Sequence, residues 1–186
     1  MRCLRPYLLL LTLVLTGCQS MPIITTEPKV DIPRYMGPWY VIAHIPAFLE
    51  RNAYNAIETY SFEAPNVVKT RFEFNDGAFD GKKKVFNPKA FVDFDSGGGL
   101  WGMQFIWPIR AEFRIVYVSS DYQTTIIGRS KRDYVWIMAR TPQISDDSYQ
   151  DLLNRVLAEG YDASKMRLVP QQAVPQQAVP QQQVSP

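Results

Sequence analysis

The stretch that decides the fold is Val67-Val68-Lys69-Thr70-Arg71-Phe72-Glu73-Phe74-Asn75. Its side chains alternate between two faces, with Val68, Thr70, Phe72 and Phe74 on one and Lys69, Arg71 and Glu73 on the other. Such alternation is typical of a β-strand that buries one face in a core and leaves the other in water. The stretch therefore predicts a half-buried strand.

Similar runs on both sides extend this prediction to a barrel. We expect seven further strands, at Trp39–Ile45, Asn55–Phe62, Lys83–Phe94 with a bend at Pro88, Leu100–Trp107, Glu112–Ser119, Gln123–Arg129 and Asp133–Arg140. Turn-forming residues separate them, as in Asn75-Asp76-Gly77. Consecutive strands with short links predict an all-β fold, an eight-stranded antiparallel up-and-down barrel, because closure removes exposed sheet edges.

A single amphipathic helix follows the last predicted strand. Ser145 is a good N-cap and Gly160 a good stop, and between them an apolar stripe recurs at helical spacing, through Tyr149, Leu152, Leu153, Val156 and Leu157. We expect this stripe to pack outside the barrel, on the face of the eighth strand that carries Val135, Ile137 and Ala139.

The first residues have the form of an export signal. Arg2 and Arg5 precede an apolar run, Tyr7–Leu15, that is too short to span a bilayer, and the run leads into Leu15-Thr16-Gly17-Cys18. This ending resembles the lipobox of bacterial lipoproteins, which predicts a signal peptide over residues 1–17 and a lipid anchor on Cys18. Gln19, rather than Asp, after the cysteine favours sorting to the outer membrane. The alternative is an ordinary secretory signal with an incidental cysteine.

Charge and cysteine content exclude several functions. Loss of Arg2 and Arg5 from 20 basic residues leaves 18, which equals the 18 acidic residues, so the processed chain has none of the basic excess that nucleic-acid binding requires. The only other cysteine, Cys3, lies in the removed segment. No disulfide framework, cysteine nucleophile or thiolate metal site is therefore expected.

Composition divides the rest of the chain into three parts. Residues 18–30 form a Pro-containing lipidated N-terminus and linker, and residues 31–169 form the folded domain. From Pro170 the chain repeats Pro-Gln-Gln-Ala-Val, which predicts a disordered tail over 170–186, because this composition buries no core. The tail is either a passive solvated segment or a binding segment in the envelope.

Three short motifs make the domain similar to a known family. Gly37-Pro38-Trp39, Ser120-Asp121-Tyr122 and Arg140 resemble, in this order, the signatures of the lipocalins. Longer segments resemble the bacterial outer-membrane lipoprotein subgroup, namely Arg34-Tyr35-Met36-Gly37-Pro38-Trp39-Tyr40, Arg132-Asp133-Tyr134-Val135-Trp136-Ile137 and Arg140-Thr141-Pro142. The resemblance spans Asp31 to Leu168 and implies a ligand-binding barrel.

In an up-and-down barrel, these motifs meet at one end. We interpret Gly37, Trp39, Asp121, Tyr122 and Arg140 as structural, with Trp39 closing that end and the Arg140 guanidinium stacked on its ring. The opposite end is then the mouth, surrounded by the connections Pro46–Tyr54, Asp76–Lys82 and Trp107–Arg110.

Alternation assigns large apolar side chains to the interior. The candidate ligand-binding residues are Phe72, Phe74, Met103, Phe105, Trp107, Arg110, Phe113 and Trp136, with Trp101 and Ile115 also inward. Such a lining suits an acyl chain, although the same side chains could simply fill a small barrel. Arg110 at the rim could bind a carboxylate or phosphate, and could also pair with Glu58 if that residue faces inward beside Ala56, Tyr60 and Phe62. Lys82, Lys83 and Lys84 are interpreted as a solvated turn.

The sequence favours binding over catalysis. His44 is the only histidine, alternation from Trp39 and Val41 places it outside the barrel, and no partner for acid–base or nucleophilic chemistry stands near it. We therefore expect no enzyme, cofactor or metal. The predicted function is a membrane-anchored lipocalin at the outer membrane, facing the periplasm, that binds, stores or transports a fatty acid or lysophospholipid. The alternatives are an envelope-tethering lipoprotein with a packed barrel and a lipocalin-type enzyme.

Overall fold

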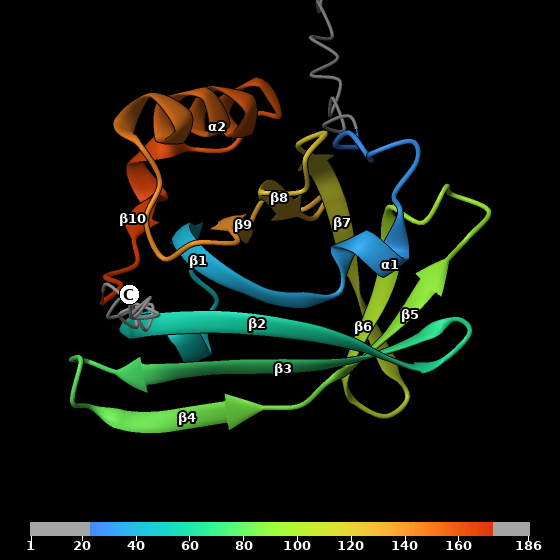
Figure 1. Ribbon diagram of the computed structural model, residues 1–186, viewed down its shortest axis with the longest axis horizontal. Helices are drawn as coiled ribbons and strands as arrows, with labels where there is room; N and C mark the ends of the chain where they lie inside the picture. The colour runs from blue at the N-terminus through green and yellow to red at the C-terminus, as the bar shows by residue number, and fades with distance from the viewer. Residues whose placement is uncertain (1–22, 173–186) are drawn as a thin grey trace, which may run out of the picture.

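The computed structural model describes residues 23–172 (Figure 1). Its strands are β1 (Gly37–Ile45), β2 (Ala53–Ala64), β3 (Val67–Asp76), β4 (Lys82–Phe86), β5 (Lys89–Asp93), β6 (Leu100–Ile106), β7 (Ile109–Val118), β8 (Thr124–Gly128), β9 (Val135–Ala139) and β10 (Arg167–Leu168). Its helices are α1 (Ile32–Tyr35), α2 (Asp146–Ala158) and the short 3-10 turns η1 (Phe48–Glu50) and η2 (Ala163–Lys165).

The sheet closes into the predicted barrel. The strands β1, β2, β3, β5, β6, β7, β8 and β9 pair antiparallel in this order, and β9 returns to pair with β1. Both β4 and β5 pair with β3, so they are two halves of one bent strand, and the barrel has eight positions. The bend falls at Pro88, whose carbonyl accepts hydrogen bonds from the Thr70 backbone N–H and hydroxyl. The predicted fold class is confirmed, and Lys82, Lys83 and Lys84 belong to β4 rather than to a turn.

The helix α2 covers the outside of the barrel, as Figure 1 shows beside β9. The Ser145 hydroxyl caps it by accepting from the Ser148 N–H, and Leu152 and Val156 are buried. These two residues belong to an outer apolar cluster with Val135 and Ile137, while Trp136 belongs to the interior cluster. Both faces of β9 are therefore buried, as the sequence predicts.

A bulge in β1 overturns one sequence prediction. The register between β1 and β9 shifts between Val41 and Ala43, so one extra residue reverses the alternation beyond that point. His44 consequently pairs with Trp136, shares its face and is fully buried. The prediction that His44 lies outside the barrel is wrong, because simple alternation takes no account of a bulge.

The predicted closure by Trp39 and Arg140 is present at one end of the barrel. The Trp39 side chain is buried and donates from Nε1 to the Tyr35 carbonyl at 2.9 Å. The Arg140 guanidinium carbon lies 3.7 Å from the centroid of the Trp39 ring. Arg140 also donates to the carbonyls of Pro38 and Arg34, both at 2.8 Å. The Arg140 guanidinium thus links the Trp39 ring to the backbone at Arg34 and Pro38.

The turn between β7 and β8 completes this closed end. The Asp121 carboxylate accepts from the Ser119 hydroxyl and the Gln123 N–H, which fixes the turn. The Tyr122 hydroxyl accepts from the Asp31 N–H at 2.7 Å, and the Arg34 guanidinium carbon lies 4.2 Å from the Tyr122 ring centroid. The turn therefore holds α1 against the end of the barrel.

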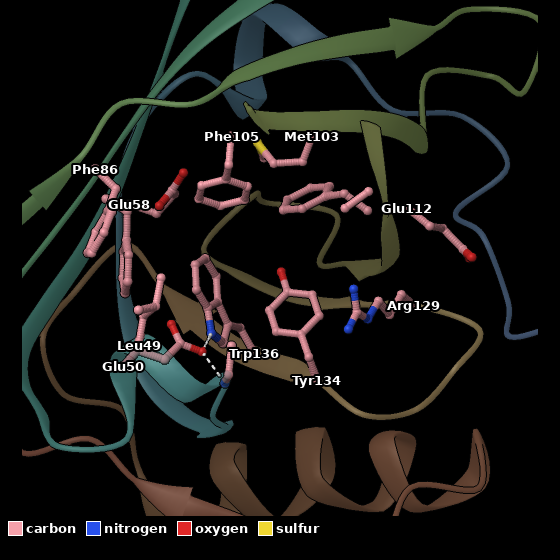
Figure 2. Close-up of a pocket in the computed structure, with 14 residues that line it drawn as sticks. Leu49, Glu50, Glu58, Phe86, Met103, Phe105, Glu112, Arg129, Tyr134 and Trp136 are labelled. Atoms are coloured by element: carbon pink, nitrogen blue, oxygen red, sulfur yellow. Dashed lines mark hydrogen bonds between the residues drawn. The ribbon is translucent and has the colours of Figure 1, made fainter. Parts of the chain in front are cut away.

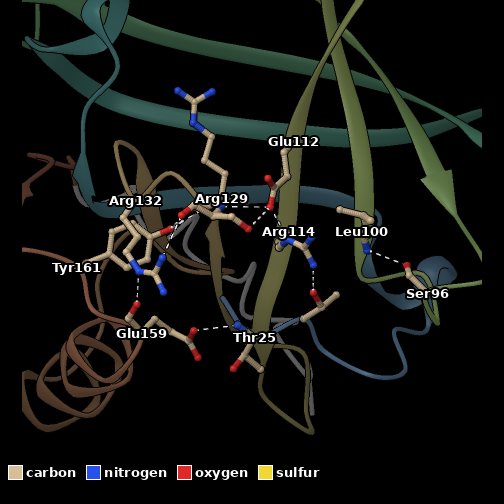
Figure 3. Close-up of polar contacts among 11 residues, drawn as sticks. Thr25, Ser96, Leu100, Glu112, Arg114, Arg129, Arg132, Glu159 and Tyr161 are labelled. Carbon is tan, nitrogen blue, oxygen red and sulfur yellow. Dashed lines mark hydrogen bonds and ion pairs between the residues drawn. The ribbon is translucent and has the colours of Figure 1, made fainter. Parts of the chain in front are cut away.

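The segment before α1 also packs on the barrel. Residues 23–30 form no helix or strand, but Ile24 is buried and the Val30 N–H donates to the Gly97 carbonyl at 2.9 Å. A side chain at Gly97, whose φ is +77°, would overlap the Pro28 carbonyl. Figure 3 shows the Thr25 backbone N–H meeting the Glu159 carboxylate at the end of α2. Over its described part, the expected linker thus lies along the domain.

The C-terminal segment fills a gap between β1 and β2. β10 pairs with β1 at Ala43 and His44, beyond the point where β2 pairs with it. The Pro170 carbonyl accepts from the Asn55 N–H, and the Gln171 amide donates to the carbonyls of Val41 and Ala56. The predicted signal peptide, Cys18 and the tail beyond Gln172 lie outside the described residues. Within residues 23–172, no helix is both long enough and apolar enough to cross a bilayer.

Candidate ligand-binding cavity

A cavity of about 140 Å³ lies inside the barrel, beside the connection that carries Leu49 and Glu50 (Figure 2). It receives side chains from β2, β3, β4, β6, β7 and β9 and from the loops at the mouth. The lining residues are Ala47, Leu49, Glu50, Glu58, Phe72, Phe86, Met103, Phe105, Ala111, Glu112, Phe113, Arg129, Tyr134 and Trp136.

The barrel brings five of the eight candidate ligand-binding residues into this lining: Phe72, Met103, Phe105, Phe113 and Trp136. Phe74 is buried two residues further along β3 on the same inward face, and its ring packs beside that of Phe72, at 5.2 Å between centroids. Trp101 and Ile115 are buried toward the closed end, where the Trp101 ring stacks on Phe113 at 5.3 Å between centroids.

Trp107 and Arg110 lie away from the cavity. Trp107 is 82% exposed at the turn between β6 and β7. The Arg110 guanidinium carbon lies 3.5 Å from the centroid of Phe91 on the outer face of the sheet, and its aliphatic part passes over Gly102. Alternation itself requires this placement, because Ala111 faces the cavity and Arg110 must then face away. Arg110 therefore does not pair with Glu58, and it does not face the cavity in which it was expected to meet a ligand head group.

Glu50 is a buried charge at the mouth that sequence reasoning missed. It is 3% exposed, and its Oε1 accepts from the Ala47 N–H at 2.9 Å and from Trp136 Nε1 at 3.0 Å. His44 Nδ1 lies 3.7 Å from the same oxygen. These contacts fix both the carboxylate and the indole ring that forms one wall of the cavity. Glu50 lies in η1, within a connection whose sequence has no periodicity to reveal its direction.

Glu58 faces the cavity from β2, as the sequence suggested, although Phe62 further along the strand is half exposed. The Glu58 side chain is 1% exposed, and its Oε2 has no hydrogen-bond partner in the described part of the chain. Burial raises the pKa of Glu58 well above its usual range. A hydrogen bond from Thr70 opposes this rise in pKa, and the negative charge of Glu50 adds to it.

The other charged groups of the lining, Glu112 and Arg129, form hydrogen bonds and ion pairs with neighbouring residues. The Glu112 carboxylate accepts from the Ser130 N–H and hydroxyl and pairs with Arg114. Arg129 pairs with Asp133, at 2.6 Å between Nη2 and Oδ2. Figure 2 shows the Glu112 carboxylate pointing away from the rings. The cavity thus combines aromatic walls with one unmatched carboxyl group.

Phe86 and Tyr134 also line the cavity and were not among the predicted site residues. Tyr134 could have been found, because it stands two positions before Trp136 on the same face of the strand. Phe86 could not, because the bend at Pro88 interrupts the alternation that would orient it. Within residues 23–172, no group of three or more His, Cys, Asp and Glu side chains is placed to hold a metal ion.

Beyond the cavity, the mouth carries exposed apolar side chains on two connections. Phe48 and Leu49 lie between β1 and β2, and Phe105, Ile106, Trp107 and Ile109 lie around the turn between β6 and β7. Leu49 and Phe105 belong both to this apolar rim and to the lining of the cavity. The apolar surface is therefore continuous from the interior of the barrel to its outside edge. Large exposed apolar patches of this kind mark sites that meet an apolar partner.

The family is decided by comparison of the whole domain. The family model described as a lipocalin-like domain matches residues 30–171. The chain belongs to the lipocalin family. Lipocalins bind small hydrophobic ligands and are in general carriers rather than enzymes.

Similarity to individual relatives supports a lipocalin of the bacterial type. It is 28% identical to the outer membrane lipoprotein Blc of Escherichia coli (strain K12) over 158 residues, which are 80% of this chain and 83% of that protein. It is 30% identical to temperature-induced lipocalin-1 of Arabidopsis thaliana over 151 residues, 76% of this chain and 80% of that protein.

Solved structures agree on the fold. Insecticyanin from the tobacco hornworm Manduca sexta superposes with a TM-score of 0.61 at 16% identity, over 80% of this chain and 84% of that chain. Lobster apocrustacyanin A1 superposes with a TM-score of 0.60 at 12% identity, over 81% and 92% of the two chains. At these identities, the likeness establishes the barrel alone.

Proposed function

We propose that this lipocalin binds a single-chain lipid, a fatty acid or a lysophospholipid, in the cavity at the mouth of its barrel. The observation that carries the proposal is the lining of aromatic and aliphatic side chains, open at one end and continuous with the apolar rim. Each methylene group buried against such a surface contributes up to about 0.8 kcal/mol. A long chain can therefore offset the cost of association without a strong head-group contact.

The size of the cavity indicates how a long chain would lie. Its volume of about 140 Å³ is close to that of an apolar cavity that holds one benzene molecule, roughly 150 Å³, and below the 300–1,000 Å³ of sites that enclose a whole ligand. The enclosed space thus accommodates one segment of the chain. The remainder would lie across Leu49, Phe105 and Ile106 at the rim, whose apolar side chains are exposed in the free protein.

We further propose that the protein is anchored by lipids on Cys18 at the outer membrane, with the barrel in the periplasm. The lipobox supports this, and so does the likeness to a protein named as an outer membrane lipoprotein. Several acyl chains on one residue give attachment that a single chain does not. Cys18→Ser should yield an unprocessed or soluble chain, and fractionation with the membranes as before would contradict the anchor.

Binding is favoured over catalysis by the position of the only histidine. His44 is buried beside Glu50 and does not line the cavity, so no general base of this type faces a ligand there. We therefore propose a carrier or store of lipid in the cell envelope, with no cofactor.

Lipid extraction tests the binding proposal. Protein purified from its own envelope without added detergent should release a single-chain lipid near one mole per mole, identified by mass spectrometry. The same preparation of Ala111→Trp, which fills the cavity from β7, should release much less. Equal amounts from both proteins would show that the lipid was carried on the surface and would contradict the proposal.

The small volume of the cavity also supports a second candidate, a tethering lipoprotein whose barrel is packed. Residues 170–172 are held between β1 and β2, which would fix the start of the Pro/Gln-rich tail at the mouth. In that case, extraction would release no lipid, and deletion of residues 173–186 would be the change that abolishes function.

A further inference from the structure

Glu58 occupies a position in the cavity that the binding of an apolar chain does not explain. It pairs across the sheet with Trp39 on one side and Phe72 on the other, which places it between the closing indole and the aromatic wall. Its Oε2 is buried without a hydrogen-bond partner among the described residues, although the carboxyl group lines the cavity. An unsatisfied buried oxygen carries a desolvation penalty that a suitable ligand group would remove.

The charges around Glu58 indicate which group would fit. Glu50 is another acid of the lining, and its carboxylate accepts hydrogen bonds from Trp136 Nε1 and the Ala47 N–H. Arg129 is the one cationic side chain of the described lining, and Asp133 already pairs with it at the rim. A ligand carboxylate at this depth would therefore meet two carboxyl groups and no available cation. In a low-dielectric site, such a like-charge arrangement is strongly disfavoured.

We propose that Glu58 forms a polar subsite at the floor of the cavity, which selects ligands that present a hydrogen-bond donor, a hydroxyl or an amine, and disfavours a carboxylate. The inference rests on the proposed function and deepens it by naming the group that enters the cavity: a hydroxyl or amine of the lipid would lie at Glu58, and the carboxylate of a fatty acid would stay outside, at the rim. Either donor would satisfy Glu58 Oε2.

The walls are compatible with both donors. The rings of Phe72 and Trp136 lie 4.8 Å apart between centroids, and Phe86 stacks beside Phe72 at 6.4 Å. Such rings accept the alkyl part of an alcohol by apolar contact and attract an ammonium group through their faces. A hydroxyl also both donates and accepts, so it matches Glu58 whether or not the carboxyl group is protonated.

The test compares three ligands that share one chain length. Lipid-free protein is titrated by calorimetry at neutral pH with decanol, decylamine and decanoate. We expect decanol or decylamine to bind at least about tenfold more tightly than decanoate, because only these two bring a donor to the buried oxygen without adding a negative charge beside Glu50. The relative strengths of decanol and decylamine show whether the subsite prefers a neutral or a charged donor.

Two variants assign this preference to Glu58. Glu58→Leu should bring the three affinities to within about threefold of one another. Glu58→Gln keeps the shape and adds an amide donor, so it should strengthen decanoate binding by at least about tenfold while decanol changes little. Glu73→Gln, on the outer face of the neighbouring strand β3, is the matched control and should behave as wild type.

Each result has a definite consequence. Equal binding of decanoate and decanol by the wild type, or a preference unchanged in Glu58→Gln, would overturn the subsite and leave Glu58 as an interior residue of the barrel. Absence of binding by all three ligands and by longer lipids would instead contradict the proposed function. If Glu58→Leu does not fold, the Glu58→Gln titration decides alone.

Discussion

The two ends of the barrel are built on opposite principles. At the closed end, the polar groups of the motif residues have partners. Trp39 Nε1 donates to a carbonyl, and the Tyr122 hydroxyl accepts from a backbone N–H. Arg140 donates to the carbonyls of Pro38 and Arg34 and stacks on the Trp39 ring. At the open end, Glu58 Oε2 lines the cavity without a hydrogen-bond partner within residues 23–172, and apolar side chains face outward. The buried Tyr60 hydroxyl, which also lacks a partner there, lies deeper among the rings of Tyr35 and Trp101 and does not line the cavity. Hydrogen-bonded groups stabilise the fold, whereas an unsatisfied group that lines a cavity is available to a ligand. Substitutions at the two ends should therefore separate stability from binding.

The largest effect on stability is expected at Trp39. Trp39→Ala removes a fully buried indole and leaves a cavity, so we expect a loss of about 3–5 kcal/mol in the free energy of unfolding. Urea denaturation followed by circular dichroism measures it. An unchanged denaturation midpoint would mean that Trp39 does not close the barrel.

Arg140 should have the next largest effect. Arg140→Ala removes charge-assisted hydrogen bonds to Pro38 and Arg34 and the contact with the Trp39 ring, for which we expect a loss of about 2–3 kcal/mol. Arg140→Lys keeps the charge but loses the planar guanidinium, so its free energy of unfolding should lie between those of the wild type and Arg140→Ala. Ligand affinity, measured where all three proteins are folded, should be the same for each.

At the open end, Glu58 should make stability depend on pH. Its folded pKa is raised above the ordinary value of 4.5, by burial first and by the charge of Glu50, with Thr70 opposing. The folded state therefore holds the Glu58 proton more tightly than the unfolded state does, and this stabilises the folded protein. The stabilisation is complete below pH 4.5 and is lost as pH rises through the folded pKa. The free energy of unfolding of Glu58→Gln should be within about 1 kcal/mol of the wild-type value at low pH. As pH rises, the variant should become more stable relative to the wild type. Parallel pH profiles of the two proteins would contradict the assigned shift.

The smallest effect on stability is expected at the apolar rim. Trp107 is 82% exposed, so Trp107→Ser should change the free energy of unfolding by less than about 0.5 kcal/mol. If the rim meets lipid, the same change should weaken association of the soluble domain with phospholipid vesicles, as measured by co-sedimentation. Phe94→Ser, which removes an exposed ring from the connection between β5 and β6 at the closed end, serves as the control. Equal sedimentation of both variants and the wild type would mean that Trp107 at the rim does not contact the lipid surface.

The closed end and the barrel could be predicted from the sequence because their signals are local and repeated. Alternation in residues 67–75 and its recurrence along the chain indicated the strands, and the motifs indicated that Arg140 would stack on the Trp39 ring. The helix α2 begins after Ser145, as its cap predicts. These features depend on neighbours in sequence or on motifs with fixed positions.

The open end was harder to predict because it depends on irregularities. One extra residue in β1 turns His44 inward, and the connection that holds Glu50 has no periodicity. Arg110 was chosen for its charge, although its alternation with Phe113 already pointed outward. The packing of residues 23–30 on the barrel brings the Pro28 carbonyl close to Gly97, a contact that only the folded chain reveals.

The central claim, that the cavity at the open end binds a lipid, is tested most directly by titration of lipid-free protein with palmitate and a lysophospholipid. The wild type should bind at least one of them saturably with one site per chain. Ala111→Trp should reduce the affinity at least about tenfold, while the exposed control Val85→Trp on β4 leaves it unchanged. Saturation by neither ligand, or equal affinity in Ala111→Trp and the wild type, would contradict the claim.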